Sequence, residues 1–397
     1  MQQLSSDLNL LIIIVFFLAF FTFAGLASLG YFLYRSIYYI FRLFFRKKSK
    51  SPLEKFEAGK IVTRAEQNPI LKPDVANEWE IQGTFNPAAW HDEHGTAHIL
   101  YRAVGSDGVS RLGYAKSIDG LNFERLPYPV YSMENIRSID KFGRTHELRF
   151  DPVLYPSGGS YGGAEDPRIV AIEDKLYITC SAFDGWDFIR IAIFSISKKD
   201  FIAQKWKWSK LMLISPEGTI NKNWVLFPEK INGKFAILHS LSPKIQIGYV
   251  DNIEDLGRGL VKIKSDFSQS KEERPDWDTW IRGAGAPPIK TKFGWLVFYH
   301  ATDKNEPHKY KLGAFILDSK DPSKILARSP KPILVPDMWY ENDSKPGVVY
   351  VCGAVIDKGV LYVYYGGGDK YACVAKVNAE EILDWIMQNG KVSDLPN

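Results

Sequence analysis

The sequence predicts an all-β fold, because one pattern of paired strands recurs five times along the chain. In each copy an alternating apolar run is followed by a polar loop and a second alternating run, which is typical of two neighbouring strands. A repeat of roughly 60 to 75 residues in a β-rich chain indicates a propeller with four strands in each blade, so we expect a five-bladed β-propeller. A two-sheet sandwich competes, but it does not readily account for five copies of one unit. The five pairs are His98–Ala103 with Arg111–Ala115, Lys175–Thr179 with Ile189–Ile193, Lys234–His239 with Ile245–Tyr249, Gly294–His300 with Lys311–Phe315, and Val360–Tyr365 with Tyr371–Ala375.

An apolar run without charged residues, 10–33, precedes the first repeat and is long enough to span a bilayer as a helix. Only Asp7 lies before the run, whereas several arginines and lysines follow it. A signal peptide is disfavoured, because its basic residues would come first. The positive-inside rule therefore predicts a single-pass membrane anchor with its C-terminal side in the cytoplasm. We divide the chain into an anchor with its basic segment, 1–50, and a propeller domain, 51–397, that ends in a short helix at 380–388.

Composition excludes several classes of function. The formal net charge of +4 among 397 residues is too small to indicate nucleic-acid binding, and most of the excess lies next to the apolar run. The three cysteines are far apart and lack metal-ligand spacing, so we expect neither a disulfide framework nor a metal site. Aromatic residues make up 14% of the chain, which suits a β-rich core and the stacking of sugar rings.

One short segment, Gly162–Arg168, contains side chains suited to catalysis. Its sequence is Gly-Gly-Ala-Glu-Asp-Pro-Arg. Its glycines permit close approach of the backbone to a ligand, and its proline fixes one dihedral angle. A carboxylate held in this way can act as a general acid in glycosyl transfer. The alternative is an ordinary strand-entry turn with a surface salt bridge. We expect the first strand of each repeat to line the central channel, so that Arg102, His239, His300 and Asp369 converge on one cavity with this segment.

A set of segments in a fixed order resembles glycoside hydrolase family 130, the β-mannoside phosphorylases and mannosidases. The resemblance extends from about position 65 to 376 and implies a five-bladed propeller, in agreement with the repeats. The N-terminal apolar run lies outside it. The matching segments are Asn86–Ala89, Tyr101–Ala103, Gly163–Arg168, Val225–Lys234, Gly283–Ile289, Tyr299–His300, Leu326–Arg328 and Cys352–Val355.

The resemblance implies roles for particular residues. Asp166 is the implied general acid, and its proton is expected to reach the glycosidic oxygen through a sugar hydroxyl. The mannose next to the scissile bond is expected to be bound by Asn86, Arg102, Glu165, Arg168 and Asp369. Guanidinium and carboxylate groups suit this role, because both can hold two neighbouring hydroxyls.

Inversion requires a nucleophile that attacks opposite the leaving group, and in the phosphorylases this nucleophile is inorganic phosphate. The resemblance implies Lys222, Arg282 and His300 as phosphate ligands. The chain departs from the family pattern at Ser240 and Ile281, where basic residues are usual, and at Asn223, where aspartate is usual.

Three kinds of function therefore remain in competition. The default is an inverting β-mannoside phosphorylase that uses no cofactor, with a β-mannosidase as a variant. The second is a membrane-associated β-mannosyltransferase that uses GDP-mannose, which would suit a cytoplasmic domain tethered to the lipid bilayer. The third is a non-catalytic glycan-binding propeller. The expected ligands are a mannose-containing glycan and either mannose 1-phosphate or GDP-mannose.

Overall fold

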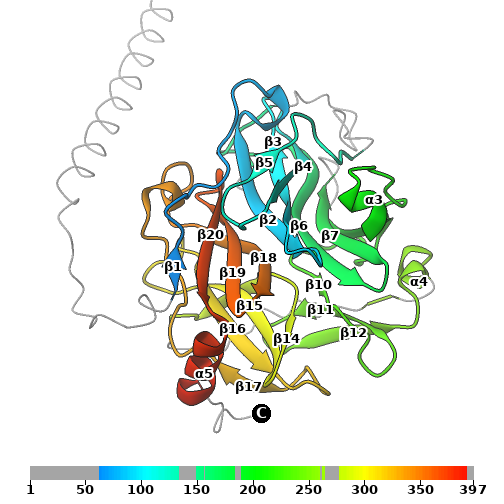
Figure 1. Cartoon of the computed structure of the whole chain (residues 1–397), viewed down its shortest axis with the longest axis vertical. Helices are drawn as coiled ribbons and strands as arrows, with labels where there is room; N and C mark the ends of the chain where they lie inside the picture. The colour runs from blue at the N-terminus through cyan, green and yellow to red at the C-terminus, as the bar shows by residue number, and fades with distance from the viewer. Residues whose placement is uncertain are drawn as a thin grey trace, which may run out of the picture. The chain divides into compact units, whose positions relative to one another are not determined.

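The computed structural model describes residues 62–133, 149–155, 157–183, 189–259, 262–263 and 277–390. The predicted anchor lies outside these residues. Among the described residues no helix is both long and apolar enough to cross a membrane. The fold is mostly β (Figure 1), as the alternating patterns predict. The closing helix is confirmed as α5, Ala379–Asn389, which begins at an Asn378 cap whose side chain accepts a hydrogen bond from the Glu381 amide.

Five blades follow one another along the chain, and the strands of each blade are ordered from the channel outward. Blades 1 and 2 consist of β2 (Gly83–His91), β3 (Ala97–Val104), β4 (Val109–Ser117) and β5 (Glu124–Arg125), then β6 (Gly162–Ile172), β7 (Lys175–Phe183), β8 (Arg190–Ser197) and β9 (Met212–Leu213). Blade 3 consists of β10 (Val225–Leu226), β11 (Phe235–Ser240) and β12 (Gln246–Val250). Blade 4 consists of β13 (Trp280–Ala284) and β14 (Ile289–Thr291), both paired with β15 (Gly294–Thr302), followed by β16 (Lys311–Leu317) and β17 (Ile325–Arg328). Blade 5 consists of β18 (Val349–Asp357), β19 (Val360–Gly367), β20 (Tyr371–Asn378) and the N-terminal β1 (Thr63–Arg64).

Short helices occupy the connections between these strands. They are η1 (Glu78–Glu80), α3 (Lys198–Ile202), α4 (Ile253–Gly257) and η2 (Trp339–Glu341). Blades 1 and 2 share one sheet, because β4 and β6 are joined by a short parallel pairing at Val109–Gly162 and Ser110–Gly163. All other strand pairs in the described part of the chain are antiparallel.

The described part of the chain forms five apolar clusters, and each lies between two neighbouring blades. Strand β11 shows how the sequence produces them. Leu238 faces blade 4, whereas Ile237 faces blade 2, because successive side chains on a strand point to opposite faces. Both faces of each blade are therefore buried. The cluster between blades 5 and 1, which includes Ile99 and Val374, completes the ring. The five-bladed propeller that the repeats predict is confirmed.

The repeats correspond to the second and third strands of each blade, so one expectation was wrong. The channel is lined by the strands that precede each repeat, and β2 contacts both β6 and β18 of the neighbouring blades. Arg102, His239 and His300 lie on second strands instead. The innermost strands escape pattern analysis because proline and glycine interrupt their alternation.

Both ends of the described chain build blade 5. Strand β1 pairs with β20. The side-chain amide of Asn68 donates a hydrogen bond to the Val374 carbonyl and accepts one from the Val374 backbone N–H, both at 2.8 Å. Arg64 forms a two-pronged ion pair with Glu341, with Nε to Oε1 at 2.7 Å and Nη2 to Oε2 at 3.0 Å. The Glu341 side chain is buried and also accepts a hydrogen bond from Tyr365. The ring is therefore closed by a largely desolvated ion pair as well as by strand pairing.

Replacing Arg64 by methionine is expected to reduce stability by about 3 kcal/mol, because the Glu341 carboxylate would be left buried without its counter-charge. Thermal unfolding of the full chain measures this loss. The matched control is Lys290→Met, which removes an ion pair with Glu229 whose partners are both about half exposed, and it should leave the unfolding temperature unchanged. Equal effects of the two substitutions would show that the ion pair at Arg64 does not hold the ring closed.

Candidate active site

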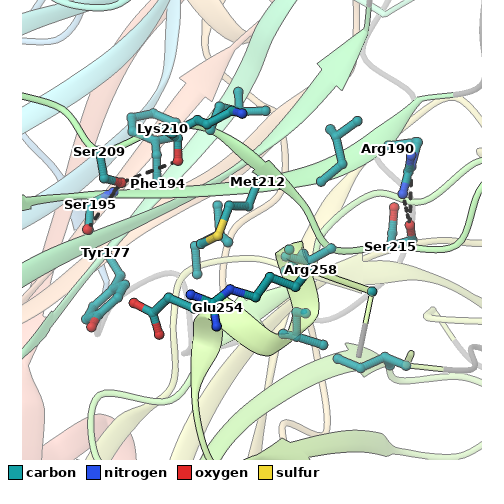
Figure 2. A pocket seen from close by; sticks show the side chains of 18 of the residues that line it. Tyr177, Arg190, Phe194, Ser195, Ser209, Lys210, Met212, Ser215, Glu254 and Arg258 are labelled. Atoms are coloured by element: carbon teal, nitrogen blue, oxygen red, sulfur yellow. Dashed lines mark hydrogen bonds between the residues drawn. The ribbon is translucent and has the colours of Figure 1, made fainter. Parts of the chain in front are cut away.

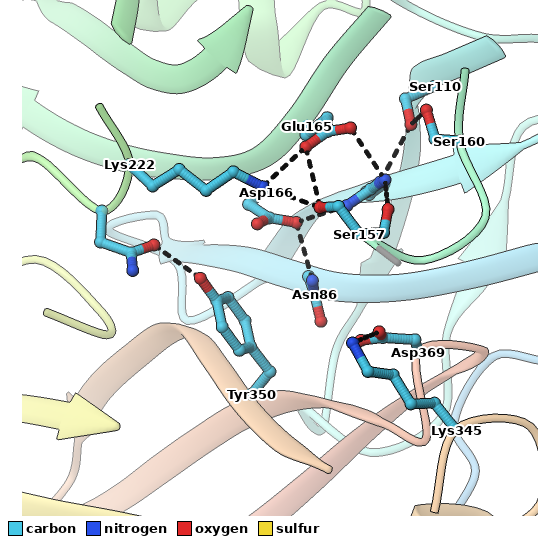
Figure 3. Close-up of polar contacts among 12 residues, drawn as sticks. Asn86, Ser110, Ser157, Ser160, Glu165, Asp166, Lys222, Lys345, Tyr350 and Asp369 are labelled. Carbon is cyan, nitrogen blue, oxygen red and sulfur yellow. Dashed lines mark hydrogen bonds and ion pairs between the residues drawn. The ribbon is translucent and has the colours of Figure 1, made fainter. Parts of the chain in front are cut away.

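A cavity of about 420 Å³ opens where the innermost strands meet. Figure 3 shows polar side chains around it. Its lining residues come from blades 1, 2, 4 and 5 and from segments that connect the blades, including residues 220–223 before blade 3. A larger hollow of about 1090 Å³ lies elsewhere, between β8, β9 and α4 (Figure 2), and none of the predicted site residues lines it. The smaller cavity is therefore the candidate active site. Its lining residues are Asn86, Arg102, Ser157, Asp166, Ile220, Lys222, Asn223, Arg282, Tyr310, Lys345, Val348, Tyr350 and Asp369.

Asn86 and Asp166 occupy equivalent positions in blades 1 and 2. Each has a φ angle of 51° and precedes a proline, at a bulge where the pairing of its strand shifts register. A positive φ is unfavourable for a residue with a Cβ atom, and bulges that re-aim a side chain are common beside active sites. In this channel the two side chains meet, since Asn86 Nδ2 donates a hydrogen bond to Asp166 Oδ1 at 2.7 Å. The bulges thus turn both polar groups into the channel.

The Asp166 carboxylate is buried and held by cationic neighbours. Arg102 Nη1 lies 3.2 Å from Asp166 Oδ1, and only 3% of Asp166 is exposed. Burial alone would raise the pKa of Asp166, but the charges of Arg102, Arg168 and Lys222 outweigh it and lower the pKa to about 2. The carboxyl group is therefore ionised at neutral pH in the free protein.

Arg102 and Lys222 share a second carboxylate, that of Glu165 (Figure 3). Arg102 Nη2 lies 3.1 Å from Glu165 Oε1, and Lys222 Nζ lies 3.3 Å from Oε2. Ser157 connects the same two cations, because its carbonyl accepts from Arg102 at 2.6 Å and its hydroxyl bonds to Lys222 at 2.7 Å. The orientation of both cations is thereby fixed before a ligand binds.

Six of the predicted ligand residues line the cavity and three do not. Glu165 contacts Arg102 and Lys222 but does not line the cavity. Arg168 is 1% exposed, and His300 is fully buried. The structure therefore places Glu165, Arg168 and His300 in a supporting layer, and their predicted direct contacts with substrate or phosphate stay untested. The six that line the cavity are Asn86, Arg102, Asp166, Lys222, Arg282 and Asp369.

His300 lies behind Tyr350. Their rings stack with centroids 4.1 Å apart, and His300 Nε2 accepts a hydrogen bond from the Val351 amide at 2.8 Å. Burial lowers the pKa of His300 to about 3, so the ring is neutral. His239, which was also expected at the cavity, contacts Trp224 and does not line it. A neutral ring facing a backbone amide suits the support of Tyr350 better than direct binding of an anion.

Several residues of the cavity were not predicted. Tyr350 donates to Asn223 Oδ1 at 2.6 Å, and Asn223 has a φ angle of 63°. Lys345 Nζ pairs with Asp369 Oδ2 at 2.9 Å. Tyr310 and Lys345 belong to loops, where no periodic pattern marks a functional side chain. The sequence marks Asn223 only as a departure from the family pattern.

Comparison with known proteins assigns the family. The model of glycoside hydrolase family 130, described as β-1,4-mannooligosaccharide phosphorylase, matches residues 54–388. The chain belongs to glycoside hydrolase family 130. The expected family and the expected class, a β-mannoside phosphorylase, are confirmed at this level. Among the described residues no group of three or more histidine, cysteine, aspartate or glutamate side chains is arranged to hold a metal ion.

Relatives within the family have named activities. The chain is 38% identical over 332 residues to a 1,2-β-oligomannan phosphorylase from Thermoanaerobacter sp., a match that covers 80% of this chain and 98% of the relative. It is 35% identical to a β-1,2-mannobiose phosphorylase from Listeria innocua, with 83% and 99% covered. A solved structure described as the Listeria innocua β-1,2-mannobiose phosphorylase in complex with β-1,2-mannobiose is similar in fold. Its TM-score is 0.60 and its identity 22%, and the match covers 83% of this chain and 99% of that one.

Proposed function

We propose that this family 130 enzyme phosphorolyses β-1,2-linked mannosides with inversion of the anomeric carbon. Asp166 supplies the proton to the leaving oxygen, Lys222 and Arg282 bind phosphate, and Asn86, Arg102 and Asp369 hold the mannose. The β-1,2 linkage is favoured over β-1,4 because both named relatives at 35% identity or more act on β-1,2-mannosides by name.

The main support for phosphorolysis is the excess of positive charge around the cavity. Among its described lining residues are four cations, Arg102, Lys222, Arg282 and Lys345, and only two carboxylates, Asp166 and Asp369. Arg282 is exposed, and its guanidinium donates to the Thr302 hydroxyl at 3.1 Å. A surplus of donors and positive charge is what an anionic co-substrate requires when it leaves water.

Hydrolysis with inversion would need a second carboxylate to activate water. Asp369 is the other carboxylate among the described lining residues, and it is paired with Lys345. The Lys345 ammonium group occupies the Asp369 oxygen that it contacts, whereas the carboxylate can still accept hydrogen bonds from sugar hydroxyls. The arrangement therefore supports phosphorolysis over hydrolysis.

The proposal is tested by incubating the full chain with phosphate and either β-1,2-mannobiose or β-1,4-mannobiose. Mannose 1-phosphate should form from the β-1,2 substrate at a rate at least tenfold higher. A preference for β-1,4-mannobiose would refute the linkage, and release of mannose without consumption of phosphate would indicate a hydrolase. GDP release from GDP-mannose with a mannoside acceptor, without turnover of mannose 1-phosphate, would favour the transferase.

We further propose that residues 10–33 anchor the enzyme in a membrane with the propeller on the cytoplasmic side. The support is the length of the uncharged run and the basic residues that follow it. Expressed in cells, the full chain should stay in the membrane fraction after an alkaline carbonate wash and resist protease added outside intact cells. Release by the wash would contradict the anchor, and digestion from outside would contradict the orientation.

A further inference from the structure

Arg168 is a buried guanidinium whose hydrogen bonds all end on uncharged oxygens. Nε donates to the Gly285 carbonyl at 3.2 Å, Nη1 to the carbonyl of Asp166 at 2.6 Å, and Nη2 to Asn223 Oδ1 at 2.9 Å. Arg102 differs, because it contacts two carboxylates. These bonds fix Arg168 beneath the cavity, between blades 2, 3 and 4. A buried charge held in this way requires an opposite charge nearby.

In the free protein that opposite charge is supplied by the Asp166 side chain. Arg102 contacts this carboxylate at 3.2 Å, and the charges of Arg102, Arg168 and Lys222 together outweigh burial and hold the pKa of Asp166 at about 2. Among the described residues, the other groups around Asp166 and Arg102 are one more cation, two carboxylates, four neutral titratable groups and an amide. They are Lys222, Glu165, Asp369, His300, Tyr350, Cys180, Cys352 and Asn86.

Phosphate would enter the same cavity as a second source of negative charge. Lys222 and Arg282 line it together with Asp166, so a bound dianion and an ionised Asp166 would lie in the same cavity. Two like charges at a shared site disfavour each other, so a bound dianion raises the pKa of the carboxylate that it faces. Protonation of Asp166 therefore raises the affinity for the dianion by the same factor by which the bound dianion raises the proton affinity of Asp166.

We propose that phosphate binding and protonation of Asp166 favour each other, so that the general acid receives its proton when the nucleophile arrives. This inference rests on the proposed phosphorolysis. Arg102 and Arg168 keep Asp166 ionised while no phosphate is bound, because their positive charges favour the carboxylate form. An enzyme without phosphate then holds a carboxylate that cannot protonate a leaving group, which suppresses hydrolysis of the mannoside.

In the proposed phosphorolysis Asp166 acts as the acid and hydrogen phosphate as the nucleophile. The bond between the anomeric carbon and the glycosidic oxygen breaks, and a bond between that carbon and a phosphate oxygen forms. The leaving oxygen takes the proton of Asp166, directly or through a sugar hydroxyl, and Asp166 returns to its carboxylate form. The proton of the attacking hydrogen phosphate is released once mannose 1-phosphate has formed. Nothing is oxidised or reduced.

Sulfate binding to the full chain tests the coupling, because sulfate is a dianion of similar shape that carries no proton in the range studied. Asp166→Asn should bind sulfate at least tenfold more tightly than the wild type at about pH 7, since the repelling charge is removed. The wild type should bind sulfate more tightly as the pH falls towards about 5, and Asp166→Asn should lack this part of the pH dependence. Calorimetric titration measures both. The control Asp251→Asn removes an exposed carboxylate outside the cavity and should match the wild type.

The outcomes separate this inference from the function on which it depends. Equal or weaker sulfate binding by Asp166→Asn, or the same pH dependence in both proteins, would overturn the coupling even if mannose 1-phosphate is produced. Tighter sulfate binding by Asp166→Asn, together with no production of mannose 1-phosphate by the wild type, would support the coupling and refute phosphorolysis. An unchanged circular dichroism spectrum and cooperative thermal unfolding show that the variant is folded, although its melting temperature should fall because Arg102 and Arg168 lose a buried counter-charge.

Discussion

Replacing Asp166 by asparagine is expected to lower kcat for phosphorolysis of a β-1,2-mannobiose by roughly 10³-fold, because the leaving oxygen would depart without a proton. The substitution keeps the side-chain volume and the contact with Asn86, so the fold should be retained. Initial rates of mannose 1-phosphate formation measure the loss. The reverse reaction should fall by a similar factor, since the same group must then accept the proton.

The leaving group provides the control for this prediction. A 4-nitrophenyl β-mannoside departs readily without protonation, so Asp166→Asn should lose far less activity on it than on the disaccharide. A uniform loss on both substrates would indicate damaged binding instead of a missing acid. An undiminished rate on the disaccharide would exclude Asp166 as the catalytic group.

Replacing Lys222 by glutamine is expected to raise KM for phosphate by roughly 10- to 100-fold, the usual cost of losing one hydrogen bond to a charged group. Lys222 Nζ lines the cavity but is anchored from behind by Ser157 and Glu165. Its removal should therefore weaken phosphate binding more than mannoside binding, and steady-state kinetics with each substrate varied in turn separates the two.

Lys230→Gln is the matched control, because Lys230 does not line the cavity and its contacts, with Glu173 at 3.7 Å and with the Phe235 ring at 4.8 Å, lie outside it. It should leave both KM values unchanged. A rise in KM for the mannoside alone after Lys222→Gln would show that Lys222 belongs to the sugar subsite and not to a phosphate site.

The blades could be predicted from the sequence because their second and third strands are long and buried on both faces. Strands such as β15 and β19 show apolar residues at consecutive positions that serve two neighbouring clusters. The innermost strands could not be predicted in the same way. Strands β2 and β6 contain a residue with positive φ followed by proline, and β10 has only two residues. These strands therefore lack the regular alternation of apolar and polar residues from which a strand is predicted.

The residues of the candidate site also fall into those that the sequence could predict and those that it could not. Asp166 and Asn86 were accessible to sequence reasoning because the acid-Pro-Arg and Asn-Pro segments are unusual and match a family motif. The supporting positions of Glu165 and Arg168 were not, because adjacent residues on a strand face opposite sides and the bulge between them changes which side is the channel. Lys345 reaches Asp369 only through the folded loop before β18. Such a contact leaves no local pattern in the chain.

The anomeric form of the first sugar phosphate released tests the central claim most directly. With β-1,2-mannobiose and phosphate, nuclear magnetic resonance of the early reaction should show α-mannose 1-phosphate, because phosphate attacks the face opposite the bond that Asp166 helps to break. Formation of β-mannose 1-phosphate, or of free mannose with phosphate unconsumed, would contradict an inverting phosphorolysis in this channel.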